Sequence, residues 1–427
     1  MVSVSESVER IKGDLRSAVP ESLIRQLCDE LEIAGRDRIL TRVVTTYLAL
    51  VRALHAAPTS ALRHHWDVEV SPQAYSQAIA RLPVEFFARL QRAVVDDCHA
   101  AEPGRSSSRW NGRRLFLIDG SSFSMPDTPE LQAAFGQPGQ QKAGCGFPTA
   151  HLLIQFAAST GFALKTIVSP LRTHDMAHAA ATHDALQHGD ILVGDRAFGS
   201  FAHFAVLRQR GLHGVFRAHQ CRTVHRRRGA RDRFVTYDKP KLKPTWMTDA
   251  EYAALPESLL VREVRLTLNE PGLRVRELVL VTTLLDAVTY PAAMIADMFG
   301  VRWSAEVNLR HLKQTLGLDV LRSHTVAGVT KELHAFVIIY NLVRRIMCTA
   351  ARAQKVKPQR ISFIDALRWL RQAAPGDRLP ELIVNPDRPG RHQPRVKKRR
   401  PKPYDLMNRP RHELRERLGI ISYPRLT

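Results

Sequence analysis

The sequence has little that would tie it to a membrane. No apolar run approaches the roughly 18 residues that a membrane span needs, and the run over 335–343 is broken by Tyr340 and Asn341. The first ten residues carry Glu6 and Glu9 and lack the basic start and apolar centre of a signal peptide. We therefore expect no membrane partner, no secretion and a cytoplasmic location.

The sequence has few cysteines, and their spacing shows no paired motif. The five cysteines are scattered, odd in number and form no Cys-x-x-Cys pair, which excludes a regular disulfide framework or a zinc ribbon and favours a reducing compartment. They are Cys28, Cys98, Cys145, Cys221 and Cys348.

Acidic residues are also in deficit. The 427 residues include 63 Lys and Arg against 41 Asp and Glu, a net charge of +22. Such a field favours a polyanion, with DNA or RNA as the leading candidates, although a generally basic proteome would give the same excess. With 44% hydrophobic residues, the chain is long enough for several domains and a sizeable core.

Periodicity divides the chain into a helical start and a mixed centre. Residues 1–100 carry apolar residues at three- and four-residue spacing and predict an N-terminal helical domain, followed by a Pro-, Gly- and Ser-containing linker over 101–112. These helices fit a DNA-reading unit or a packing bundle. Residues 113–220 then give three strands, a helix (176–187), a strand, a helix and a strand, which predicts a mixed α/β sheet.

The remaining segments differ in composition. Residues 221–290 start with a basic stretch and contain two strand candidates (261–268 and 274–285), which predicts a β-rich insertion. Residues 291–353 return to helix. The C-terminal region, 354–427, ends in a basic tail: residues 388–411 hold ten Lys or Arg, five Pro and a single acid.

Two aspartates follow short apolar runs. Asp119 follows 115–118 and Asp195 follows 191–194, and each precedes small residues. Ligands of open α/β sheets bind at strand ends, so adjacent strands would bring both carboxylates to one site. An acid after a strand also commonly caps the next helix, and for either residue alone that interpretation stays open.

A third acid lies on a predicted helix over 299–316. Spacings of three and four residues place a set of polar and aromatic side chains on one face: Phe299, Arg302, Glu306, Arg310 and Lys313. An adjoining stripe of apolar residues on this helix would pack against the rest of the protein. An ordinary surface helix with an acid flanked by bases would look similar.

Three converging carboxylates would repel each other unless divalent cations joined them. We therefore expect Asp119, Asp195 and Glu306 to be the catalytic residues and to bind two Mg²⁺ ions, with Mn²⁺ as a substitute, in a phosphoryl-transfer site. Arg302, Arg310 and Lys313 would hold phosphates of the same DNA strand.

These blocks together resemble the DDE transposases of bacterial insertion sequences, in the insertion-sequence family four group. Its Tyr-x2-Arg-x3-Glu-x6-Lys motif matches Arg302, Glu306 and Lys313, with Phe299 at the Tyr position. The segments 118–131 and 194–211 are similar to the two Asp-containing motifs of that family.

The resemblance implies an RNase H-like core interrupted by the β insertion, with DNA contact by Phe299, Arg302 and Lys313. It also implies Mg²⁺-dependent hydrolysis at terminal inverted repeats, attack of the freed 3′-hydroxyl on target DNA in cut-and-paste transposition, and a homodimer on paired ends. Phe299 lacks the hydroxyl of the family Tyr. There are two alternatives: a catalytically inactive DNA-binding derivative, and an RNase H-like nuclease that cuts DNA without joining it.

Overall fold

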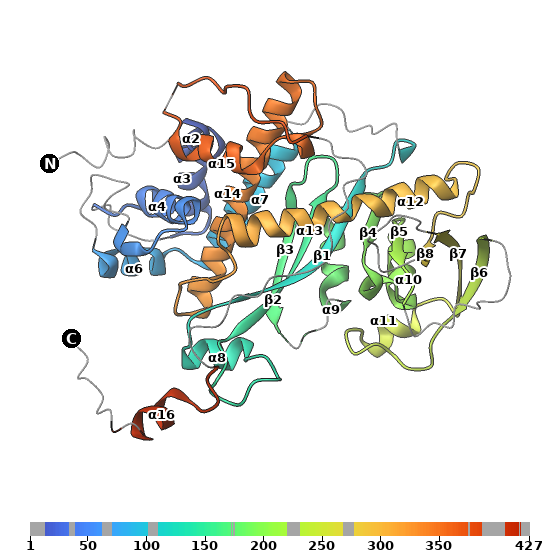
Figure 1. The fold of residues 1–427 in the computed structure, drawn as a ribbon, viewed down its shortest axis with the longest axis horizontal. Helices are drawn as coiled ribbons and strands as arrows, with labels where there is room; N and C mark the ends of the chain where they lie inside the picture. The colour runs from blue at the N-terminus through green and yellow to red at the C-terminus, as the bar shows by residue number, and fades with distance from the viewer. Residues whose placement is uncertain are drawn as a thin grey trace.

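The computed structural model describes residues 13–33, 39–61, 71–100, 110–171, 173, 176–219, 231–267, 277–374, 376–386, 406–417 and 419. Figure 1 shows an α/β molecule in which helices from the two ends of the chain gather beside the central sheet, while the strands of the 232–282 region extend that sheet at the opposite edge.

The sheet has eight strands in the order β3-β2-β1-β4-β5-β8-β7-β6. β1 pairs antiparallel with β2 and parallel with β4, and β4 pairs parallel with β5, so the sheet is mixed as the sequence predicts. The strands are β1 (Leu115–Ser124), β2 (Thr149–Ala157), β3 (Ala163–Pro170), β4 (Ile191–Gly194), β5 (His213–Arg217), β6 (Asp232–Asp238), β7 (Ser258–Thr267) and β8 (Glu277–Thr282).

The predicted β-rich segment contributes β6, β7 and β8. β8 pairs antiparallel with β5, so these strands join the edge of the same sheet. The segment also contains a short helix, α11 (Asp249–Ala253), which opens with a capping box between Thr248 and Glu251. The basic stretch at 220–230 lies outside the described residues.

The helices before residue 100 surround one long helix near the C-terminus. α4 and α7 pack against α14 (Val326–Ala353), and α15 (Phe363–Gln372) packs against it as well. The described part of residues 1–100 is helical, as the apolar spacing predicts. Its helices are α2 (Gly13–Ala18), α3 (Glu21–Glu30), α4 (Arg42–His55), α6 (Pro72–Arg81) and α7 (Val84–Ala100).

α14 is long and apolar enough to cross a membrane by length and composition, and 67% of its most apolar stretch is buried inside the protein. It lies against the early helices and β3. Its Asn341 side chain accepts a hydrogen bond from the Ala163 backbone N–H at 2.8 Å, which ties it to the start of that strand.

Two apolar clusters cover the two faces of the sheet. The larger includes Leu117 of β1 and Val193 of β4 together with buried residues of the helices around α14. The smaller includes Ile118 of β1 and Leu192 of β4, with α10 (Phe201–Gln209) and α11 against it. Successive side chains of a strand point to opposite faces of the sheet. Odd-numbered and even-numbered residues of β1, and likewise of β4, therefore lie on opposite faces.

Several loop segments differ from the sequence prediction. The predicted helix over 176–187 is wrong in its extent: α9 (Met176–Ala179) is one turn, followed by the 3₁₀ segment η3 (Ala180–Ala185). A short helix, α8 (Pro129–Phe135), was missed. Near the C-terminus is α16 (Arg411–Arg417), and Pro410 just before it lies beside Gly144 in the loop that follows α8, while residues 388–405 of the predicted basic tail lie outside the described residues. Among the residues that the structure describes, Cys28, Cys98, Cys145 and Cys348 are thiols and form no disulfide.

Candidate active site

Asp119 lies inside β1 and not at its end, so the predicted strand end is wrong. It is the Cα partner of Ile154 in β2, and pairing continues from Gly120 to Ser124. Glycine and serine are typical of turns, but here the ladder to β2 satisfies their backbone groups. The Asp119 side chain accepts a hydrogen bond from the Gly120 N–H at 2.9 Å.

Asp195 directly follows β4, as predicted. Its side chain accepts a hydrogen bond from the Arg196 N–H at 2.7 Å and caps the 3₁₀ turn η4 (Arg196–Phe198). The capping interpretation is therefore correct for this residue. It is compatible with a place in the site, because a carboxylate that accepts one bond keeps further lone pairs.

The sheet register brings the two aspartates level. β1 and β4 are parallel neighbours with Leu117 opposite Val193, and each aspartate follows two residues later. Leu117 and Val193 belong to the larger cluster, so alternation directs Asp119 to that face of the sheet. The sequence analysis expected both carboxylates at one site if their strands were adjacent, and the pairing of β1 with β4 supplies that adjacency.

Glu306 comes from the helix that crosses the same face. α12 (Ala292–Val301) and α13 (Trp303–Arg310) run in succession across the sheet (Figure 1), and α13 packs against β1. The predicted apolar stripe of this helix is confirmed, since Ala305 and Leu309 are buried. Burial of this stripe leaves Glu306 beside the strand, with 37% of its side chain exposed.

The pKa of Asp119 depends on the charges of the other two acids. The pKa of Asp119 is raised to about 6, chiefly by burial; the charges of Glu306 and Asp195 act in the same direction, and the Arg302 guanidinium acts in the opposite direction. A carboxylate whose pKa responds to two other acids is desolvated and surrounded by like charge, which is the environment that a bound cation stabilises.

Among the described residues, no three His, Cys, Asp or Glu side chains already stand close enough to hold one ion. Glu306 instead accepts a hydrogen bond from Arg302 at 2.9 Å. The donor set still suits Mg²⁺, which prefers carboxylate oxygens, retains waters and needs few protein ligands when phosphate oxygens complete its shell. Asp119 and Asp195 from the sheet, with Glu306 from the helix, are the residues that would bind it.

The other predicted DNA-contact residues divide into two groups. Arg302 lies over the Phe299 ring with its guanidinium carbon 5.5 Å from the centroid, and Arg310 is exposed at the end of α13. Lys313 lies beyond the end of α13, so the regular helical spacing that placed it on this face does not extend to it. It lies in the π-helical turn η5 (His311–Thr315) and forms an ion pair with Asp319 at 3.0 Å.

The π turn explains this difference. The Leu316 N–H donates to the His311 carbonyl, five residues back, so the helix winds more slowly there and the face rotates. Asp319 was missed as the partner of Lys313, because no sequence pattern signals a π turn.

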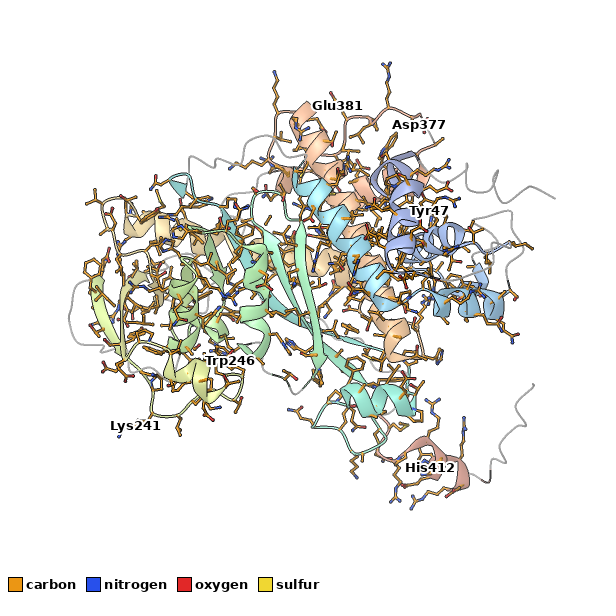
Figure 2. All side chains as sticks on the ribbon, turned by 180° about the vertical axis from the view of Figure 1, so that it is seen from behind. Tyr47, Lys241, Trp246, Asp377, Glu381 and His412 are labelled. Atoms are coloured by element: carbon orange, nitrogen blue, oxygen red, sulfur yellow. The ribbon has the colours of Figure 1, made fainter. Side chains whose placement is uncertain are left out.

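Trp246 lies away from this site. It packs against the smaller apolar cluster, on the opposite side of the sheet from α13, and Figure 2, which views the molecule from behind, shows it near the helices of that side. It therefore contributes no aromatic surface near Asp119.

Carboxylates on two adjacent parallel strands, facing an acid and arginines on a crossing helix, define a class of enzyme that acts on phosphodiesters. A family model described as the transposase DDE domain matches residues 110–342, more than half of the chain. The chain belongs to this family and is a phosphoryl-transfer enzyme that acts on DNA.

Two curated transposases and one solved transposase structure are similar to this chain. The chain is 27% identical over 362 residues to the transposase InsG for insertion sequence element IS4 of Escherichia coli strain K12, covering 78% of each chain. It is 27% identical over 136 residues to the putative transposase InsZ of the same strain, covering 32% of this chain and 44% of that one. The piggyBac transposase in its synaptic complex with hairpin DNA aligns at a TM-score of 0.46 and 10% identity, covering 87% of this chain and 79% of that one.

Proposed function

We propose that this protein is the transposase of a bacterial insertion sequence of the family four group, which cuts DNA at terminal inverted repeats and joins the freed 3′-hydroxyl to a target by a cut-and-paste route. The observation that carries the proposal is the parallel β1–β4 register, which sets Asp119 level with Asp195 on the face that α13 crosses. The overall likeness to InsG supports the substrate class.

The strand order supports an RNase H-like core. β3-β2-β1-β4-β5 form one mixed unit, with the second aspartate after β4, and β6 to β8 enter the chain between that aspartate and the Glu306 helix. This is the place at which the family resemblance expects an insertion. The strands of the insertion extend the sheet beyond β5 and leave the face over β1 and β4 to α12 and α13.

The residues of the site have separate tasks. Asp119, Asp195 and Glu306 would hold the divalent ions, which would stabilise the charge that develops on the phosphodiester oxygens. Arg302 and Arg310 bind phosphates of the cut strand, and Phe299 presents a ring without a hydroxyl beside them. Two chains acting together on paired ends would complete the reaction.

The proposal is tested with DNA that carries the repeats flanking the reading frame in the genome. The full chain with Mg²⁺ or Mn²⁺ should cut at the repeat boundary and join the 3′-end to a second duplex, while DNA with scrambled repeats stays uncut. Cutting without joining would identify an RNase H-like nuclease, and binding without cutting would identify an inactive DNA-binding derivative. Either result would overturn the proposal.

A further inference from the structure

A buried pair of histidines lies behind the Asp195 turn. His183 of η3 and His203 of α10 are 2% and 0% exposed. Their Nε2 atoms are 3.0 Å apart and their ring planes are inclined by 13°, which fits one hydrogen bond in the plane of both rings. Both rings lie among the apolar residues of the smaller cluster, on the sheet face away from α13.

The partners of the pair determine where its protons lie. The Nδ1 atom of His203 is 2.8 Å from the Phe198 carbonyl oxygen, which can only accept, so His203 carries its proton on Nδ1. Its Nε2 then accepts a hydrogen bond from the Nε2–H of His183. Burial lowers the pKa of His203 to about 4 and also lowers that of His183, so both rings are neutral at neutral pH.

The Phe198 carbonyl closes the turn that Asp195 opens. Asp195 caps the three-residue segment η4, and Phe198 is its last residue. The Phe198 ring folds back over Gly194, where an added Cβ would stand 2.8 Å from the ring. The turn is therefore clamped by ring packing on the residue before Asp195 and by the His203 hydrogen bond at its far end.

We propose that His203, braced by His183, is a positioning residue that fixes the Asp195 carboxylate for metal binding. His183 donates to His203, His203 donates to Phe198, and the fixed turn sets the direction of Asp195 towards Asp119. Residues behind metal ligands contribute about 10–100-fold to metal affinity or activity in other proteins. The inference rests on the proposed role of Asp195 as a metal ligand.

Two substitutions of the same residue separate positioning from packing. An asparagine amide can replace the Nδ1–H donor and a glutamine amide the Nε2 group, so His203→Asn keeps the bond to Phe198 and His203→Gln loses it. Phe204→Leu alters a neighbouring buried ring of the same cluster and is the packing control. Melting temperature and end-DNA affinity establish that each full-length variant is folded.

The readouts are the Mn²⁺ affinity of the full chain on its end DNA, measured by electron paramagnetic resonance, and the Mg²⁺ concentration that half-saturates cleavage. His203→Gln should weaken the Mn²⁺ affinity and raise the half-saturating Mg²⁺ concentration, each by about tenfold or more, whereas His203→Asn and Phe204→Leu should stay close to the parent protein. Unchanged values in His203→Gln, or equal losses in all three variants, would overturn the inference. Asp195→Ala is run beside them: if that variant still cleaves, the proposed function itself fails.

Discussion

Arg302 donates a hydrogen bond to Glu306 at 2.9 Å across one turn of the α12–α13 path, so the third acid of the site is paired with a cation of its own helix. Arg302 also lowers the pKa of Asp119, against the effect of burial. The positive charge of Arg302 therefore offsets the negative charges of both Glu306 and Asp119. In the proposed reaction it would be released to a DNA phosphate when Glu306 turns to a metal ion.

Replacing Arg302 should therefore alter both the cleavage of repeat DNA and the pH dependence of that cleavage. Arg302→Ala removes the main charge that lowers the pKa of Asp119, so this pKa should rise further and the midpoint of cleavage should move to higher pH. Cleavage at the repeat should fall by about 10–100-fold, more than general DNA affinity. Arg302→Lys keeps the charge and should retain the wild-type midpoint. Equal losses on every DNA would contradict a specific place for Arg302.

The desolvated Asp119 carboxyl should make the metal-free protein more stable in acid. Its pKa is about 6 in the folded chain against 3.8 for a free side chain. The neutral form is favoured by folding, so this contribution to stability is complete below pH 3.8 and is lost as the pH rises through about 6. Asp119→Asn should raise the melting temperature at pH 7.5 by about 2–4 °C, the shift that about 1 kcal/mol gives in a sizeable domain.

That gain should shrink towards pH 4.5, where Asp119 itself is protonated. Thermal denaturation in EDTA across this range provides the measurement. Asp249→Asn is the matched control, since its side chain is 96% exposed and lies in the insertion. A gain for Asp119→Asn that did not change with pH would contradict the electrostatic account.

The Lys313–Asp319 ion pair gives a prediction for the π turn. If Lys313 exchanges Asp319 for a DNA phosphate, Lys313→Ala should lose a hydrogen bond to a charged group, about 1.5–3 kcal/mol, and weaken formation of the end complex by about tenfold or more. Asp319→Asn keeps the lysine and should bind the ends at least as well as the parent protein. Gel-shift titrations of repeat and non-repeat DNA measure both, and a weaker Asp319→Asn would argue against the exchange.

Deleting the C-terminal region tests whether it contributes to the non-specific affinity for DNA. Deleting residues 388–427 removes at least ten cations, and each lost phosphate contact should lower the slope of log affinity against log salt by about 0.9. The deletion also removes α16, whose neighbour Pro410 lies against Gly144, so the melting temperature is compared in parallel. An unchanged salt slope would mean that the tail stays off DNA.

Short apolar runs with clear boundaries were predictable to the residue. β4 (Ile191–Gly194) matches the predicted apolar run over 191–194, because Asp190 and Asp195 bound it. The sequence predicted a shared site for Asp119 and Asp195 on condition that their strands were adjacent, and β1 and β4 are parallel neighbours.

Other features depend on contacts that the local sequence does not contain. β1 continues beyond Asp119 through residues typical of turns, because β2 supplies its hydrogen bonds. The π turn at Lys313 depends on how the helix end packs, and the His203–Phe198 bond depends on the folding of α10 behind β4. Spacing along the chain gives no sign of either.

Cleavage by single-carboxylate variants on repeat DNA tests the central claim most directly. Asp119→Ala, Asp195→Ala and Glu306→Ala should each lower the single-turnover cutting rate by more than about a hundredfold, beyond the range seen for residues behind metal ligands, while gel-shift affinity for the ends changes little. Full-rate cutting by any one of these variants, in Mg²⁺ or Mn²⁺, would contradict a shared site of these three residues.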